Sequence, residues 1–233
     1  MAYHYGHSTD AVKAIAYLSQ SAARAVRSFA HVEASTAYQL ALQHVEGLPA
    51  GKRDRCHLDL LLRQAFSLSI LGRFRELHDL LAPQRERLEQ LHEPGLSGPY
   101  HFWLGMTLTY LGDFDQARPY AQRALEAAQH CHDIATQGMA HHLLAFISHA
   151  LGHGTQGLAH GRKAVALLET TGEWHWLGLA YWDVGLSAIY LGEFVTAREA
   201  LAHTRSLGEA HEDKRLLHFA DIHLGVIHML HGE

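Results

Sequence analysis

The sequence repeats with a period of 40 residues, and this repeat constrains the fold more than any other feature. A leucine-glycine pair recurs at that interval, and the last copy has histidine in place of leucine. A small residue lies seven positions before each glycine. The pairs are Leu71-Gly72, Leu111-Gly112, Leu151-Gly152, Leu191-Gly192 and His231-Gly232, and the small residues are Ala65, Gly105, Ala145, Gly185 and Gly225. This regularity predicts a stack of similar helical units rather than a bundle with accidental spacing.

Each regular spacing within the repeat has a physical reason. A glycine after an apolar helical run ends the helix, because it adopts the left-handed conformation without strain. The small residue seven positions earlier allows the next helix to approach closely, and aromatic and small residues after the glycine fill that contact. Those residues are Phe74, Phe114 and Phe194, followed by Ala117, Gly157 and Ala197. The unit is therefore predicted to be helix A, a turn, helix B and a short loop.

Apolar periodicity predicts helix almost throughout and no strands. The predicted pairs of A and B helices are 53–71 with 74–91, 98–111 with 114–131, 134–151 with 155–170, and 173–191 with 194–208, followed by a last helix at 213–231. Pro83 and Pro119 fall inside B helices and should kink or break them. Loops are predicted at Glu93-Pro94-Gly95 and Thr171-Gly172-Glu173. The expected fold class is all-α, a right-handed α-solenoid of antiparallel helix pairs with a 40-residue repeat.

The chain is expected to have two parts. Residues 1–50 form irregular N-terminal helical repeats, with helices at 10–28 and 31–46 and a linker at 47–51. Residues 51–233 form the regular array, about four full repeats plus one unpaired A helix. Because Ala2-Tyr3-His4-Tyr5 resembles the tail of a helix and no polar capping repeat is present, we expect a fragment of a longer protein.

Composition narrows the class of function. Among 233 residues, 48% are hydrophobic and 18% are charged, which permits a packed core. The net charge of −5 and the lack of any Lys/Arg cluster argue against a nucleic-acid partner. Cys56 and Cys131 are not in a metal-type spacing, so a reducing, cytoplasmic location is expected. No apolar run near 18 residues or signal peptide is evident, so no membrane association is predicted.

The repeat resembles the tetratricopeptide repeat over roughly residues 53–232. The matching residues are Leu104-Gly105, Leu108, Leu111-Gly112-Asp113-Phe114-Asp115-Gln116-Ala117 and Ala124-Leu125, and again Val184-Gly185, Leu191-Gly192-Glu193-Phe194 and Ala197. The period is 40 rather than the usual 34, and the proline that closes each repeat is missing. The resemblance implies a protein-interaction fold without specifying a partner.

A narrower resemblance concerns the N-terminal residues. Ala2-Tyr3-His4-Tyr5, Ala14-Ile15-Ala16-Tyr17-Leu18, Ala34, Ala41-Leu42 and Leu48-Pro49 are similar to the repeat region of large bacterial signal-transduction ATPases of the STAND type. That group includes transcriptional regulators and ATPase-linked class III nucleotide cyclases. The resemblance implies a region that senses an inducer or a partner protein in a larger regulator.

The 22 histidines raise the alternative of a metal-dependent sensor or enzyme. His149 with His153, His228 with His231, and His130-Cys131-His132 are the candidate ligand groups. No established metal motif, phosphate loop or catalytic elbow accompanies them. We therefore predict no catalytic residues, no metal site and no cofactor, and the chain is predicted not to be an enzyme.

By analogy with tetratricopeptide arrays, the A helices should line a concave groove that binds a protein, a peptide or a small-molecule inducer. The candidate binding residues are Phe102, Met106, Tyr110, His142, Phe146, His149, Trp182 and Tyr190. One register position on this face of the A helices, which we call the middle row, is apolar in every repeat. Its residues are Phe66, Met106, Phe146, Leu186 and Val226. This row is either buried core or the floor of the groove. Self-association into a homo-oligomer through exposed solenoid ends is a further alternative.

Overall fold

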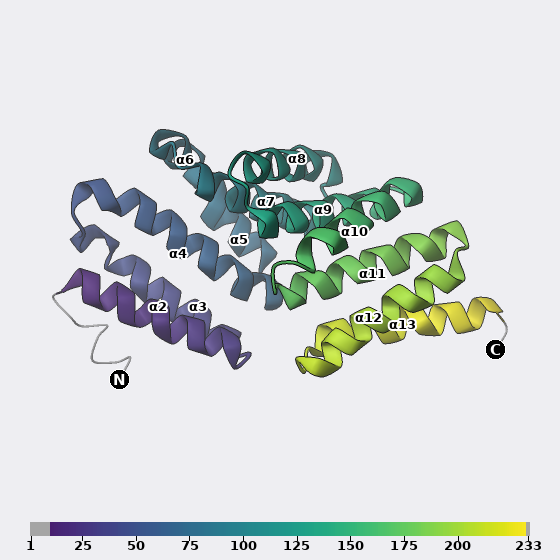
Figure 1. The fold of residues 1–233 in the computed structure, drawn as a ribbon. Coiled ribbons are helices and arrows are strands. Elements are labelled where there is room, and N and C mark those ends of the chain that lie inside the picture. The colour runs from purple at the N-terminus through teal and green to yellow at the C-terminus, as the bar shows by residue number, and fades with distance from the viewer. Residues whose placement is uncertain (1–9, 232–233) are drawn as a thin grey trace. The chain divides into compact units, whose positions relative to one another are not determined.

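The computed structural model describes residues 10–231, in which all regular elements are helical (Figure 1). The α-helices are α2 (Ala11–Arg27), α3 (His31–Gln43), α4 (Ala50–Ile70), α5 (Phe74–Leu81), α6 (Arg85–Leu91), α7 (Pro94–Tyr110), α8 (Phe114–His130), α9 (Ile134–Ala150), α10 (Gly154–Leu168), α11 (Trp174–Leu191), α12 (Phe194–Ala210) and α13 (Lys214–His231). Two short 3₁₀ helices are Val45–Gly47 and Ala82–Gln84. The predicted all-α fold is confirmed.

The chain forms two compact units, which divide between Gly112 and Asp113. In the second unit, α9 packs on α10, α10 on α11, α11 on α12 and α12 on α13. The A helix α11 also contacts the A helices α9 and α13, so successive A helices form one layer and the B helices form another. The predicted division at residue 50 concerns repeat regularity and stays a prediction. The predictions for Ala2-Tyr3-His4-Tyr5 and for Gly232 concern positions outside the described residues.

The turns from A to B helices have the predicted glycine conformation. The φ angles of Gly72, Gly112, Gly152 and Gly192 are 69°, 87°, 78° and 74°. Each lies in the left-handed region, where a side chain would be strained. The glycine spacing in the sequence is therefore confirmed as a series of helix-terminating turns.

A second series of left-handed residues ends the B helices and has the same period. His92, His132, Gly172 and Glu212 have φ angles of 50°, 55°, 76° and 54°. Only one of these four residues is glycine, so the series has no common residue type by which it could have been predicted. The two kinds of turn alternate every 20 residues from Gly72 to Glu212.

Small residues bring the A and B helices together as predicted. A Cβ atom on Gly185 would lie 2.7 Å from the Leu201 side chain, closer than real Cβ contacts. Ala65 and Ala145, at the same register position, are fully buried. Gly225 differs, because a Cβ atom there would meet nothing within 4 Å.

The prolines confirm one predicted break and correct one predicted loop. The predicted B helix 74–91 is interrupted at Pro83, where a 3₁₀ turn separates α5 from α6, so this break is confirmed. The loop predicted at Glu93-Pro94-Gly95 is wrong, because α7 begins at Pro94. Proline is favoured at the first helical position, where its missing N–H needs no partner. Pro119 lies within the uninterrupted α8.

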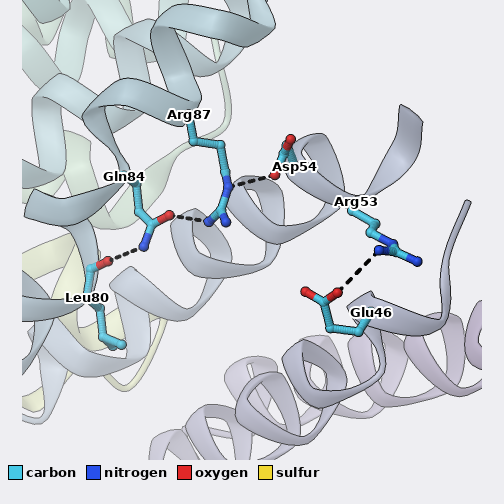
Figure 2. A network of polar contacts seen from close by, with 6 residues as sticks. All are labelled: Glu46, Arg53, Asp54, Leu80, Gln84 and Arg87. Atoms are coloured by element: carbon cyan, nitrogen blue, oxygen red, sulfur yellow. Dashed lines mark hydrogen bonds and ion pairs between the residues drawn. The ribbon is translucent and has the colours of Figure 1, made fainter. Parts of the chain in front are cut away.

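A polar network in the first unit links α6 to α4 beyond the Pro83 break (Figure 2). Arg87 on α6 donates through Nε to Asp54 on α4 over 2.7 Å and also to Gln84. Gln84 in turn donates to the carbonyl of Leu80 over 3.2 Å. Arg87 and Gln84 are half-buried and Asp54 is exposed, so the ion pair is expected to stabilise the fold only modestly while it holds α6 against α4.

The predicted linker at 47–51 is shorter than expected. The 3₁₀ turn Val45–Gly47 includes its first residue, and α4 already begins at Ala50. Arg53 reaches back from α4 and donates to Glu46 over 3.4 Å (Figure 2). The connection is therefore a tight corner rather than a free linker.

Candidate binding surface

The structure places the eight predicted binding residues at very different depths. Phe102, Met106, His142 and Trp182 are at most 8% exposed, Phe146 and His149 are half-buried, and Tyr110 and Tyr190 are 40% and 65% exposed. The exposed members lie at the C-terminal ends of their A helices. The two tyrosines are therefore accessible at the surface, whereas four of the other six residues are buried.

The residues of the apolar middle row are buried or partly buried. Met106 and Leu186 are buried, and Phe66, Phe146 and Val226 are partly buried. Burial of this kind favours the core interpretation of the row over the groove-floor interpretation. The binding role of the eight residues stays a prediction.

Trp182 sits in an aromatic cluster of the second unit. Its ring stacks on Phe219, with centroids 4.8 Å apart, and lies 5.7 Å from Phe146. The Trp182 Nε1–H donates to His223 Nδ1 over 3.2 Å, while the same Nδ1 lies 2.7 Å from the carbonyl oxygen of Phe219. An unprotonated Nδ1 can accept from Trp182, whereas a protonated Nδ1 can donate to Phe219. The proton on His223 therefore decides which of the two contacts forms.

His149 and Tyr190 form the accessible edge of this cluster. Their rings meet edge to face with centroids 4.5 Å apart. The buried His149 Nδ1 has no hydrogen-bond partner among residues 10–231. Burial lowers the pKa of the ring, and the nearby His223 lowers it further. A neutral imidazole with an unused nitrogen beside an exposed phenol can both accept and donate hydrogen bonds.

The first unit has a tyrosine at the equivalent register position. Tyr110 stacks on Phe74 with centroids 4.1 Å apart and an interplanar angle of 5°. This contact fixes the Tyr110 ring against the start of α5, the B helix of the preceding pair, while 40% of the side chain stays exposed. Each unit thus presents one tyrosine at the end of an A helix.

Two buried histidine-aspartate pairs were not anticipated from the sequence. His142 Nδ1 lies 2.6 Å from Asp183 Oδ2, and His175 Nδ1 lies 2.7 Å from Asp213 Oδ2. Burial raises the pKa of Asp183, whose Oδ1 has no hydrogen-bond partner in the described chain. Asp183 is an acidic residue inside an otherwise apolar helix, which is the signal that could have identified it.

The second pair differs in its electrostatics. Burial lowers the pKa of His175, against the opposing effect of Asp213. Burial alone would raise the pKa of Asp213, but hydrogen bonds from His175 and from two backbone N–H groups hold it below its usual value. Asp213 is thus an ionised cap at the start of α13, whereas burial favours the protonated form of Asp183.

The histidines proposed as metal ligands are not assembled into a site within the described residues. No group of three or more His, Cys, Asp or Glu side chains there is arranged to hold a metal ion. His153 is exposed at the turn before α10, and His132 is exposed at the turn after α8. Among the described helices, none has the length and apolar character needed to cross a membrane.

Comparison with known proteins agrees with this architecture. Residues 98–131 match the tetratricopeptide repeat family. No curated protein matches the chain by sequence. Solved structures do resemble it, but their sequence identities are low, so the resemblance shows the fold alone.

Three of these structures cover most of the chain. BtubC (BKLC) from P. vanneervenii has a TM-score of 0.64 and 17% identity over 87% of this chain and 81% of its own. A Rap protein complexed with Competence and Sporulation Factor has a TM-score of 0.67 and 15% identity over 94% and 72%. A putative kinesin light chain from Podosopora anserina, with nearly identical TPR-like repeats, has a TM-score of 0.58 and 14% identity over 86% and 97%.

The 40-residue helix pairs, the left-handed glycine turns and the close approach at Gly185 fit the same architecture. The chain therefore has the tetratricopeptide-repeat fold, and residues 98–131 have the sequence pattern of that repeat family.

Proposed function

We propose that this chain is a non-catalytic module that binds a protein or peptide partner and serves as a sensor region in a larger bacterial regulatory protein. The tetratricopeptide-repeat fold supports the interaction role. The resemblance of the N-terminal residues to STAND-type regulators supports the regulatory setting and a cytoplasmic location. A small-molecule inducer is compatible with the same setting.

The accessible edge formed by His149 and Tyr190 is the observation that supports a binding site most directly. Tyr190 is 65% exposed, and its ring is already oriented by the edge-to-face contact with His149. A preoriented aromatic ring offers a large contact area at a small entropic cost. The unused His149 Nδ1 could become accessible when the edge adjusts to a peptide, and it would then accept a backbone N–H.

The Rap protein gives a parallel on the same fold. That protein is seen complexed with Competence and Sporulation Factor, and its structure covers 94% of this chain. We extend this to our chain only as support for a regulator whose repeat region receives a separate factor. The residues named above are our own assignment.

A displayed peptide library selected on the purified chain would test the proposal. We expect enriched peptides whose affinity falls by about tenfold in Tyr190→Ala and by a smaller factor in His149→Ala, since interface aromatics contribute on the order of 1–2 kcal/mol. Val195→Ala is the matched control, because Val195 is 74% exposed on the neighbouring B helix. Selected peptides that bind Tyr190→Ala as tightly as the unaltered chain would contradict the proposal.

Self-association is a second candidate with its own observation. Ile222, Met229 and Leu230 on α13 are 46%, 75% and 61% exposed, which is unusual for apolar side chains on one helix. Light scattering on the chain and on Met229→Lys/Leu230→Glu would test it. A concentration-dependent dimer that this variant abolishes supports association through α13, and a monomer at all concentrations rejects it.

A further inference from the structure

The second unit has a pocket on its B-helix layer, apart from the His149–Tyr190 edge. The cavity has a volume of about 300 Å³ and lies between α10 and α12, over α11. It is lined by Arg162, Val165, Ala166, Glu169, Tyr181, Val184, Thr196, Glu199, Ala200 and His203. Tyr181 and Tyr190 both belong to α11, but nine residues separate them, so they point about 180° apart around the helix.

Comparison with the preceding repeat explains why a cavity forms here. His141 of α9 and His160 of α10 occupy the register positions of Tyr181 and Ala200, 40 residues earlier. The Nδ1 atoms of these two histidines lie 3.0 Å apart, so His160 fills the space between the helices. At Ala200 the side chain is a single methyl group, and the equivalent space is left open.

The pocket has an apolar floor. Val165, Val184 and Ala200 form part of one packed cluster with Leu158 and Tyr181. The Tyr181 ring is held in place from two directions, by stacking on His203 at 4.6 Å and by donating its O–H to Glu169 over 2.6 Å. The floor is therefore fixed before any guest arrives.

The rim of the pocket is charged, with an acidic excess. Glu169 and Glu199 contribute two carboxylates, and both side chains are exposed at the mouth. The single guanidinium at the rim, that of Arg162, lies 3.9 Å from Glu193, so its charge already faces another carboxylate. Burial raises the pKa of Tyr181 to about 12, so the phenol keeps its proton and Glu169 remains an acceptor.

We propose that this pocket receives a lysine side chain of a partner protein. The aliphatic stem would lie on the apolar floor, and the ammonium group would lie at the rim between Glu169 and Glu199. A long apolar stem with a compact charged head matches a floor and rim of this kind. An anionic guest would face the carboxylates, and a fully apolar guest would gain no attraction from their charge. The site would let the module hold a partner on the layer that faces away from Tyr190.

Nuclear magnetic resonance titration with two small amides tests the proposal. N-acetyl-lysine-N-methylamide contains the stem and the ammonium, whereas N-acetyl-norleucine-N-methylamide contains an equivalent apolar side chain without the charge. We expect the lysine amide to shift the amide signals of the residues that line the pocket, and the norleucine amide to bind at least severalfold more weakly. Equal binding of the two amides, or no shift with the lysine amide, would overturn the proposal.

Two substitutions sharpen the test. Glu199→Gln should weaken the lysine amide about two- to fivefold, the range expected for an exposed ion pair. Glu126→Gln, an exposed carboxylate on α8, is the matched control and should leave affinity unchanged. Ala200→His copies His160 of the preceding repeat and should close the pocket and abolish binding. If that variant is misfolded by circular dichroism, the comparison of Glu199→Gln with Glu126→Gln still decides, and equal affinities reject the proposal.

A last arm separates a protein lysine from a free amine. Butylammonium has the stem and the charge but no peptide groups. We expect it to bind more weakly than the lysine amide, because the exposed side chains at the rim contact the flanking backbone. Butylammonium binding as tightly as the lysine amide would reject the assignment to a protein partner.

Discussion

The helix pairs α9/α10 and α11/α12 come into close contact at the same two register positions, but the glycine lies on a different helix in each pair. In the first pair the A helix has Ala145 and the B helix has Gly157, and in the second the A helix has Gly185 and the B helix has Ala197. A Cβ atom on Gly157 would lie 3.4 Å from the Ala145 carbonyl oxygen, and one on Gly185 would lie 3.4 Å from the Ala197 carbonyl oxygen. The packing fixes the distance between the helices, and either helix can provide the glycine.

The same two pairs also differ at the positions on either side of this contact. On the B-helix side, the first pair has His141 against His160, and the second pair leaves the pocket beside Tyr181. On the other side, His142 of the first pair corresponds to Trp182 of the second. The same register position is thus histidine in one repeat and tryptophan in the next. The two helix pairs should therefore respond differently to mutation and to pH.

The largest expected effect is at the position shared by His142 and Trp182. Trp182→Ala should lower the free energy of unfolding by about 3–5 kcal/mol, because it leaves a cavity among Phe146 and Phe219. His142→Ala should cost a similar amount near neutral pH, about 3–5 kcal/mol, because it leaves Asp183 buried without its partner. Denaturant unfolding measures both losses.

The pH dependence separates these two variants. Burial raises the pKa of Asp183 and the contact with His142 lowers it, so in His142→Ala this pKa rises further and the folded state holds the proton to a higher pH than in the unaltered chain. The loss in His142→Ala should therefore grow as pH rises from about 4 to 7, and the loss in Trp182→Ala should stay constant. A Trp182→Ala variant that is as stable as the unaltered chain would refute its place in the core, and Tyr190→Ala serves as the exposed control.

Acid should destabilise the first pair through His141. Burial, reinforced by the charge of His160, lowers the pKa of His141 to about 4. Between pH 6.5 and 4 the unfolded state then binds more protons than the folded state, so stability rises with pH and is lost on acidification. The loss between pH 7 and 4 that is due to His141 should reach up to about 3 kcal/mol.

The double variant His141→Tyr/His160→Ala tests the source of this loss by copying the second pair. We expect it to flatten the pH profile of the unfolding midpoint between pH 4 and 6.5. A residual slope will remain, because burial also lowers the pKa of His57 and His175. A profile unchanged by the double variant would show that the acid sensitivity arises elsewhere.

Glycine at the helix contact gives the next effect in size. Gly185→Leu should cost about 1–3 kcal/mol, because its side chain would overlap Leu201 and force α11 and α12 apart. Gly225→Leu is the control at the same register position, where a Cβ atom meets nothing within 4 Å. We expect this control to unfold at or above the midpoint of the unaltered chain, since leucine favours helix over glycine. Equal losses in both variants would contradict the close-contact role of Gly185.

Part of this comparison could be predicted from the sequence. The glycine turns follow from the backbone conformation that ends a helix. The small residues at the helix contact follow from their fixed position within the repeat. The His142–Asp183 pair spans 41 residues and the His175–Asp213 pair spans 38, so neither keeps the 40-residue step. Such pairs depend on which way side chains point between neighbouring repeats, and periodicity alone does not specify this.

The burial of the individual candidate binding residues could not be predicted from the sequence either. Phe102 and Tyr110 both lie on the predicted inner stripe of α7, yet one is fully buried and the other is 40% exposed. Exposure depends on where neighbouring helices end, and boundaries are the least certain part of a sequence prediction. Pro94 shows the same point, since a residue read as a loop signal begins a helix.

The smallest expected effect concerns the left-handed residues that end the B helices of successive repeats. His132 and Gly172 occupy the same register position, with φ angles of 55° and 76°. A residue with a side chain pays a strain of roughly 1–2 kcal/mol in this conformation, partly offset because glycine has more freedom to lose on folding. His132→Gly should therefore raise the free energy of unfolding by up to about 1 kcal/mol, and Gly172→His should lower it by a similar amount. The urea midpoints of the two variants should move in opposite directions, and a shift of both in the same direction would show that contacts of the His132 ring, rather than backbone strain, determine stability at this turn.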